Sequence, residues 1–322
     1  MPKFKIKHTT RYTYKGLVRD SANQVILFPI NDEYQEVLKH DLKISGDPAV
    51  EIYKDYYGNE VGTFTHCEPH AELLIVSRVQ VITTPRPLPT DDIFAIEQWL
   101  ALEKLKHKIP YIDYLKQEHF YGLDELKTIV EQEDIEHETP FDTANRFNKY
   151  IWENFKYIPG ITTVETRLEE IWQLKAGVCQ DFAHILLVML RLKNIPARYV
   201  SGYICPHRNG MRGEGATHAW VEAYIPNYGW LGLDPTNNCV ANETHVRLAV
   251  GRNFPDCSPV KGVYKGAAEH KLEVSVTVSY GSEDEEKTSD TIEAIPIVKS
   301  TGTFPVNSFQ QHLEMMQQQQ QQ

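Results

Sequence analysis

The run QDFAHILLVMLRL, residues 180–192, is apolar almost all the way round when it is drawn as a helix. A helix without a polar face has to be enclosed, so this run predicts a buried helix. The small-residue turn Ala176-Gly177 precedes it and places Cys179 at or next to the helix N-terminus. The N–H groups and the positive dipole end of a helix N-terminus favour a thiolate, and the same N–H groups can donate to an oxyanion. Buried cysteines are also common in cores, so Cys179 alone leaves a nucleophilic and a structural interpretation open.

Two later segments, ATHAWVEAYI and GWLGLDPTN, read as strands joined by the turn IPNYG. Alternation puts His218 and Trp220 on the face opposite a small, apolar one, and it puts Asp234 opposite Leu231 and Leu233. A five-residue loop over 225–229 would then place Asp234 diagonal to His218 on the same face, within reach of its side chain. The sequence can therefore build a cysteine nucleophile, a histidine base and an aspartate that orients the imidazole.

Four blocks occur in a fixed order: GVCQDFAH, LKNIPARYVSGY, THAWVEAYIPNYGWLGLDPTN and GRNFPDCSPVKGVYKG. Together they resemble the transglutaminase-like superfamily of bacteria, which is related to animal transglutaminases and more distantly to papain-type peptidases. The resemblance spans residues 140–266, and the preceding part is similar to the β-rich region in front of the catalytic core. It implies that Cys179 is the nucleophile, His218 the general base and Asp234 the third member. The implied reaction is attack of a thiolate on an amide to give a thioester, which water or an amine then resolves.

We expect an α+β fold. A papain/transglutaminase-like core, in which the helix carrying the cysteine packs on an antiparallel sheet carrying the histidine and aspartate, follows an N-terminal β-sandwich-like domain. Short β runs fill residues 1–85, and the Pro-rich break TTPRPLPTDD marks the boundary. The catalytic domain is expected over 86–281, with the strand KLEVSVTVSY ending the folded core. Residues 282–322 are acidic and Gln-rich and are expected to be disordered.

Five further residues are expected to contribute to substrate binding: Trp172, Gln180, Tyr203, Trp220 and Asp256. Three of them have a plainer interpretation that the sequence leaves open. Trp172 either lines the acyl pocket or packs in the core, and Asp256 either binds a substrate amine or caps a turn. Gln180 and Asp181 are also placed to cap the start of the helix. His184 is a rival base, but it lies well round the same helix from Cys179, which favours His218.

No cofactor is implied. His66, Cys67 and His70 lack the paired spacing of a zinc site, and we find no calcium-binding loop and no phosphate-binding glycine motif. The formal net charge of −11 argues against a nucleic-acid partner, and no apolar segment is long enough to span a membrane. An odd number of cysteines, five, and the lack of a signal-peptide pattern favour free thiols in the cytoplasm. The expected partner is a peptide or protein substrate, and the oligomeric state is left open.

The leading hypothesis is a thiol-dependent amide hydrolase, a peptidase or amidase. One alternative is a protein-glutamine transglutaminase, which transfers the acyl group to an amine. Another is a peptide-binding module that has the fold of these enzymes but no catalytic activity.

Overall fold

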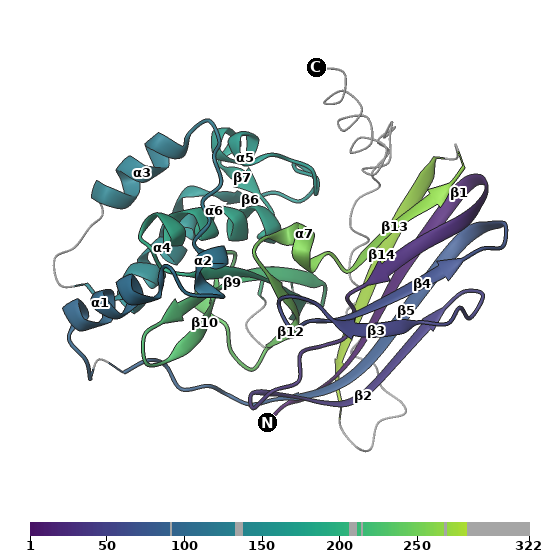
Figure 1. The fold of residues 1–322 in the computed structure, drawn as a ribbon, viewed down its shortest axis with the longest axis horizontal. Helices are drawn as coiled ribbons and strands as arrows, with labels where there is room; N and C mark the ends of the chain where they lie inside the picture. The colour runs from purple at the N-terminus through teal and green to yellow at the C-terminus, as the bar shows by residue number, and fades with distance from the viewer. Residues whose placement is uncertain (91, 133–137, 206–210, 214, 267–268, 282–322) are drawn as a thin grey trace.

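The computed structural model describes residues 1–281 except positions 91, 133–137, 206–210, 214 and 267–268. A strand-rich part and a helix-covered part lie side by side (Figure 1). Among the described residues, no helix is both long and apolar enough to cross a membrane.

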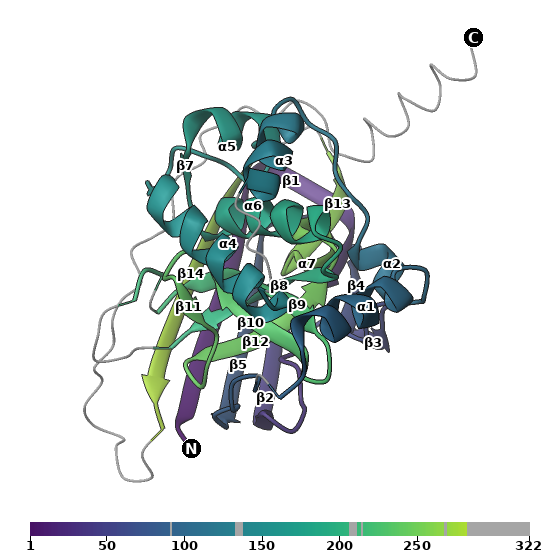
Figure 2. The ribbon, with the colours of Figure 1, turned by 90° about the vertical axis from the view of Figure 1, so that its left-hand side faces the viewer.

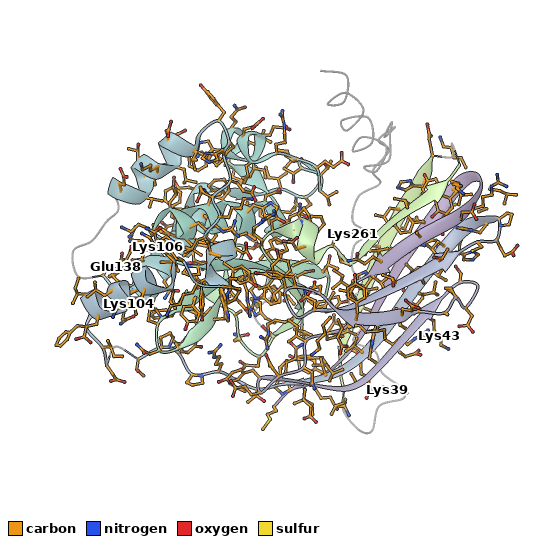
Figure 3. All side chains as sticks on the ribbon, in the orientation of Figure 1. Lys39, Lys43, Lys104, Lys106, Glu138 and Lys261 are labelled. Carbon is orange, nitrogen blue, oxygen red and sulfur yellow. The ribbon has the colours of Figure 1, made fainter. Side chains whose placement is uncertain are left out.

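The N-terminal part is built around one long strand, β1 (Lys3–Val25). β1 pairs with β5 and β14 along its first half and with β4 and β13 along its second, so the antiparallel strands form a single sheet. The other strands of this sheet are β2 (Gln35–Ile44), β3 (Glu51–Lys54), β4 (Glu60–His66), β5 (His70–Thr83), β13 (Val260–Lys265) and β14 (His270–Tyr280). Lys39 and Lys43 are exposed on the edge strand β2, where charged side chains discourage pairing with another sheet (Figure 3).

The last two strands depart from the predicted division of the chain. Residues 86–281 were expected to form the catalytic domain, but β13 and β14 join the N-terminal sheet (Figures 1 and 2). β14 follows β1 continuously from the pair Phe4↔Tyr280 to the pair Tyr14↔His270. Val276 and Val278 alternate inward on β14 and pack in the same core as Phe4. The boundary near residue 85 stays a prediction, and the predicted tail over 282–322 lies outside the described residues.

The second part is a five-stranded antiparallel sheet in the order β11-β10-β9-β8-β12. Its strands are β8 (Ala197–Ile204), β9 (Thr217–Ile225), β10 (Gly229–Asp234), β11 (Cys239–Val240) and β12 (His245–Gly251). β6 (Lys156–Tyr157) and β7 (Ala176–Gly177) form a separate, short parallel pair. The helices are α1 (Ala95–Leu105), α2 (Tyr111–Tyr114), α3 (Leu123–Gln132), α4 (Pro140–Asn154), α5 (Leu168–Leu174), α6 (Cys179–Leu192) and α7 (Phe254–Cys257).

Helix α6 lies at the centre of this part, between the sheet and the other helices (Figure 2). Its residues from Phe182 onward pack in one core with the apolar face of β9, which carries Ala219, Val221 and Ala223. Because each buried Leu, Ile or Phe side chain contributes roughly 1.5–3 kcal/mol, this all-round burial fixes the helix in place. The predicted buried helix is confirmed, and it holds Cys179 at its first residue.

Helix α4 packs on α6 through apolar residues that recur at helical spacing. Ala144, Phe147 and Ile151 are all buried in the shared core. Thr139 caps this helix by accepting the backbone N–H of Asp142 over 3.1 Å. This cap fixes the residue at which α4 begins.

Candidate active site

Cys179 is the first residue of α6 and is half-buried. The carboxylate of Asp181 organises this helix start by accepting the N–H of Val178 over 2.8 Å and the hydroxyl of Thr162 over 2.6 Å. Burial raises the pKa of Asp181, and these two hydrogen bonds oppose the rise. A Cβ at Gly177 would collide with the same carboxylate, which explains the small residue before the cysteine. At the start of a helix the N–H groups of Cys179 and Gln180 have no intrahelical acceptor, so they can face an anion.

His218 and Asp234 come from the hairpin β9–β10, in the register that the sequence predicts. Trp230 pairs with Tyr224 and Leu233 with Val221, which sets Asp234 diagonal to His218. Nε2 of His218 and Oδ2 of Asp234 are 2.9 Å apart. The hairpin prediction is therefore confirmed, and its consequence is a buried imidazole–carboxylate pair.

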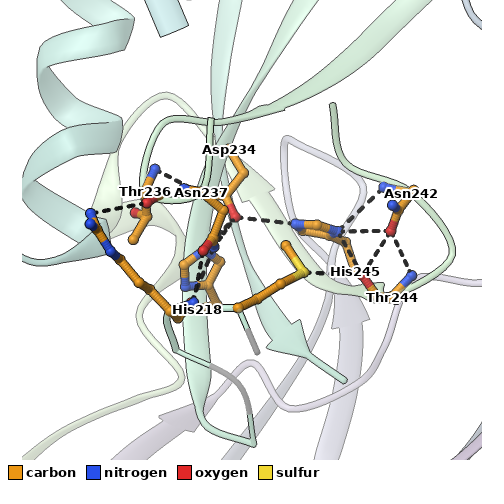
Figure 4. Close-up of polar contacts among 9 residues, drawn as sticks. His218, Asp234, Thr236, Asn237, Asn242, Thr244 and His245 are labelled. Atoms are coloured by element: carbon orange, nitrogen blue, oxygen red, sulfur yellow. Dashed lines mark hydrogen bonds and ion pairs between the residues drawn. The ribbon is translucent and has the colours of Figure 1, made fainter. Parts of the chain in front are cut away.

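Asp234 is surrounded by N–H donors (Figure 4). Besides His218, its Oδ2 accepts from Nδ2 of Asn237 over 2.7 Å and from Nε2 of His245 over 3.3 Å. Its Oδ1 accepts the backbone N–H of Thr236 over 2.9 Å and that of Asn237 over 3.3 Å. Burial alone would raise the pKa of Asp234, but the charge and hydrogen bonds of His218 and His245 hold it well below its usual range. The carboxylate is thus kept ionised and fixed in orientation.

The environment of His218 favours its charged form. Burial alone would lower the pKa of His218, but the charges of Asp234 and Cys179 and the hydrogen bond to Asp234 raise it to about 10. Since Nε2 is directed to Asp234, Nδ1 is the nitrogen left for the thiol, and it has no hydrogen-bond partner among the described residues. Such contacts are often loose without substrate and tighten during the reaction. The arrangement can therefore hold a thiolate–imidazolium pair.

Three residues of this site were missed from the sequence. Asn237 and His245 anchor Asp234, and Tyr157 lies beside Cys179 because β6 pairs with β7, with Tyr157 opposite Gly177. Burial, followed by the charge of Cys179, raises the pKa of Tyr157 to about 12. The turn-forming DPTNN after β10 was the one available signal for Asn237. The other two carry no local pattern that separates them from ordinary strand residues.

One group of side chains near Asp234 has the composition of a metal site. Ligand atoms of Asp234, Cys239 and His245 lie within 4.8 Å of one another. Oδ2 of Asp234, however, already accepts three N–H groups. Burial, followed by the Asp234 charge, also raises the pKa of the Cys239 thiol to about 12, so the thiolate that a metal needs is disfavoured. We therefore interpret His245 as a hydrogen-bond donor to Asp234 and not as a metal ligand.

Three of the side chains predicted to bind substrate are themselves buried. Trp172 lies in the core and donates its indole N–H to Glu125 over 2.7 Å. The hydroxyl of Tyr203 is 2.9 Å from Nδ1 of His8, between the two parts of the chain. Trp220 is buried, with its ring stacked near His218 at a centroid distance of 6.2 Å. None of the three presents a free surface to a substrate. The prediction that they contact the substrate is therefore corrected: these side chains pack inside the protein.

Three positions singled out from the sequence remain: Asp256, His184 and Gln180. Asp256 accepts the backbone N–H of Arg252 over 2.9 Å, which fits the turn-capping interpretation. Burial lowers the pKa of His184 to about 4, and its Nε2 accepts the N–H of Phe254 over 3.3 Å. His184 is thus occupied within the core, which agrees with the preference for His218. Gln180 lies next to Cys179 on α6 and stays a predicted substrate contact.

Comparisons with known proteins agree with this geometry. The model of the transglutaminase-like superfamily matches residues 128–235, and that of the bacterial transglutaminase-like N-terminal region matches residues 4–82. An uncharacterized protein of Mycobacterium leprae is 30% identical over 285 residues, covering 87% of this chain and 99% of the relative. The chain belongs to the transglutaminase-like superfamily. The two family models together match both the strand-rich part and the core with Cys179.

Two further comparisons concern one sequence and one solved structure. A protein-glutamine gamma-glutamyltransferase of Pseudomonas aeruginosa is 35% identical over 98 residues, which cover 28% of this chain and 14% of that protein. A solved structure from Cytophaga hutchinsonii, described as a candidate cysteine protease, superposes with a TM-score of 0.70 at 22% identity. It covers 88% of this chain and 92% of its own, so the fold is shared along nearly the whole length.

Proposed function

We propose that this protein is a thiol-dependent hydrolase of amide bonds in a peptide or protein substrate. The observation that carries the proposal is the buried His218–Asp234 pair, 2.9 Å apart, with Cys179 beside the imidazole at a helix N-terminus. The five cysteines are unpaired, which supports our placing of the enzyme in a reducing compartment, the cytoplasm.

The chemistry follows from these groups. The Cys179 thiolate attacks the substrate carbonyl, and the helix N-terminal N–H groups stabilise the oxyanion. His218, held as an imidazolium by Asp234, gives its proton to the leaving amine as the C–N bond breaks and a thioester forms. The neutral His218 then takes a proton from water, which attacks the thioester and releases the acid and the thiolate.

A second candidate is transfer of the acyl group to an amine instead of water. The partial match to a protein-glutamine gamma-glutamyltransferase favours it. Both reactions share the thioester, so they differ in the nucleophile that resolves it. Adding a primary amine to the reaction and analysing the product by mass spectrometry separates hydrolysis from transfer.

The test of either activity is the reactivity of Cys179 as a function of pH. Iodoacetamide labelling followed by peptide mass spectrometry reports all five thiols at once, with exposed Cys67 as an ordinary thiol and buried Cys205 and Cys257 as protected ones. We expect selective labelling of Cys179 at pH 6 and its loss in His218→Ala. The contrary result is that Cys179 is labelled no faster than Cys67 and that its rate does not depend on His218. This would refute the proposal that the protein is an enzyme and would favour the silent binding module.

A further inference from the structure

The segment 211–213 is fastened beside the catalytic histidine by one side chain, that of Asn237. Oδ1 of Asn237 accepts the backbone N–H of Arg212 over 2.8 Å, and its Nδ2 lies 3.1 Å from the backbone carbonyl of Arg212. The same Nδ2 donates to Oδ2 of Asp234 over 2.7 Å. The backbone of Arg212 is therefore held at both of its polar groups and tied to the carboxylate that orients His218.

Gly213 brings this segment into contact with the imidazole. Its φ of +82° is a conformation that favours glycine, and a Cβ there would lie 2.8 Å from Nδ1 of His218. Nδ1 is the ring nitrogen that remains for Cys179. The segment thus borders the reacting edge of the histidine, and Arg212 lies directly before Gly213.

The side chain of Arg212 is exposed and has no ionic partner among the described residues. Its guanidinium carbon lies 5.8 Å from the ring centroid of Tyr157, and its Nη1 is 3.5 Å from the carbonyl of Thr236, at the limit of a hydrogen bond. Within the described part of the chain, no carboxylate forms an ion pair with it. Two other arginines of this part differ, because Arg198 pairs with Glu222 and Arg247 with Asp32.

Tyr157 connects this arginine to the nucleophile. Tyr157 pairs through its backbone with Gly177, directly before the Cys179 turn. The charges of Cys179 and Arg212 act on its phenol in opposite directions, so both groups lie near this ring. Arg212 and Cys179 therefore approach the same aromatic side chain.

We propose that Arg212 forms an anion-binding subsite beside Cys179 that selects amide substrates carrying a carboxylate next to the scissile carbonyl. A guanidinium suits this task because its planar donors match a carboxylate, and the fixed backbone of Arg212 reduces the ordering needed on binding. The carboxylate comes either from an acidic side chain or from a free chain terminus, and the chemistry of recognition is the same. This inference rests on the proposed function, since the same thiolate takes up the acyl group.

The first experiment compares two alkylating reagents on the full-length protein. In both, the Cys179 sulfur forms a bond to carbon while iodide leaves, but iodoacetate is anionic and iodoacetamide is neutral. We expect Arg212→Gln to lower the ratio of the iodoacetate rate to the iodoacetamide rate by about fivefold, because a nearby cation concentrates an anionic reagent. Arg212→Lys retains most of the ratio, and Arg212→Glu lowers it further. Arg11→Gln, on the exposed face of β1, serves as the matched control with an unchanged ratio.

The second experiment identifies the source of the carboxylate. Peptide amides with Glu or Gln beside the scissile position, each with a free or an amidated C-terminus, are compared in the wild type and in Arg212→Gln. A preference for peptides with Glu, or for peptides with a free C-terminus, that disappears in Arg212→Gln supports the subsite. The preferred series then identifies which carboxylate the subsite binds. Slow labelling of Cys179 by iodoacetamide in the wild type would refute the proposed enzymatic function. Rapid labelling with a ratio that does not respond to Arg212 would overturn the subsite alone.

Discussion

The imidazole of His218 and the carboxylate of Asp234 are joined over 2.9 Å, and neither side chain is exposed to solvent. A buried carboxylate is costly unless its charge is matched, and here it is matched by an imidazole and four further N–H contacts. The pair therefore favours a protonated His218 next to the thiol.

Asp234→Asn tests this relationship most directly. The amide keeps the shape of the side chain but removes the charge that raises the pKa of His218. We expect turnover to fall by roughly 10²- to 10⁴-fold, as for loss of a charge that orients a catalytic imidazole. Iodoacetamide labelling of Cys179 at pH 6 should slow in parallel. Asp41→Asn, an exposed change on β2, controls for a general effect of charge removal. Unaltered labelling in Asp234→Asn would contradict the role of the carboxylate.

The raised pKa of His218 also makes stability depend on pH. The folded state holds a proton on His218 up to a pKa of about 10, whereas the unfolded state releases it near the ordinary value of 6.5. The contribution is therefore complete below about pH 6.5 and is lost as the pH rises toward 10, by an amount on the order of a few kcal/mol. Urea unfolding of the wild type and of His218→Gln at pH 6, 8 and 9.5 measures it. The difference between the two proteins should shrink as the pH rises, and a constant difference would contradict the ionised pair.

The sequence predicts those parts of the site that follow from periodicity. The apolar run after Cys179 predicts a buried helix, and the alternation around His218 and Asp234 predicts a hairpin whose register the structure confirms. Both are local patterns in which each residue's face is set by its position along the chain. These two patterns are therefore enough to place Cys179 at a helix start and His218 beside Asp234, whereas the pairing of Cys179 with this histidine is what the family resemblance implies.

Other parts depend on contacts that no local pattern records. β1 is a single strand of 23 residues, and the alternation on β14 does not say which sheet it joins. Likewise, the ring of donors around Asp234 includes Asn237 and His245 from segments after β10, and their bonds arise from how those segments fold back. Trp220 lies on the strand face that the alternation predicts, but this face is also buried, here against other strands, so its ring is not open to a substrate.

Gly213→Ala tests the close approach of segment 211–213 to His218. The added methyl group would meet Nδ1 of His218, and the positive φ costs about 1–2 kcal/mol for alanine. Gly58→Ala is the matched control, since Gly58 has a similar φ of +86° but nothing near its Cβ position. We expect both variants to lose comparable stability in thermal unfolding. Only Gly213→Ala should slow labelling of Cys179, and equal labelling in the two variants would contradict the approach.

Arg191→Met tests a buried cation outside the site. The guanidinium of Arg191 donates to the carbonyls of Tyr114, Lys116, Ala197 and Arg252, which belong to separate segments around α6. Methionine fills much of the space but leaves these carbonyls without their donor, which should cost roughly 2–5 kcal/mol of unfolding free energy. Arg11→Met, on an exposed strand face, should change it by less than about 0.5 kcal/mol. Similar denaturation midpoints for both variants would show that Arg191 is dispensable.

His245 gives the last prediction, because it offers a second imidazole to the same carboxylate oxygen as His218. Nδ1 of His245 accepts the backbone N–H of Asn242 over 3.3 Å, which leaves Nε2 to donate to Asp234. His245→Leu removes this donor, so the pKa of Asp234 should rise toward its usual range. Since a lowered carboxylate pKa stabilises the fold above that pKa and the effect is lost as the pH falls, acid unfolding of His245→Leu should begin at a higher pH. His245→Gln is the matched variant, because its Nε2 lies the same number of bonds from the backbone and can restore the contact. Acid titration followed by circular dichroism should therefore rank the wild type and the Gln variant together, with the Leu variant less acid-stable. Identical acid midpoints for all three would mean that the contact with His245 adds nothing to the hold on Asp234.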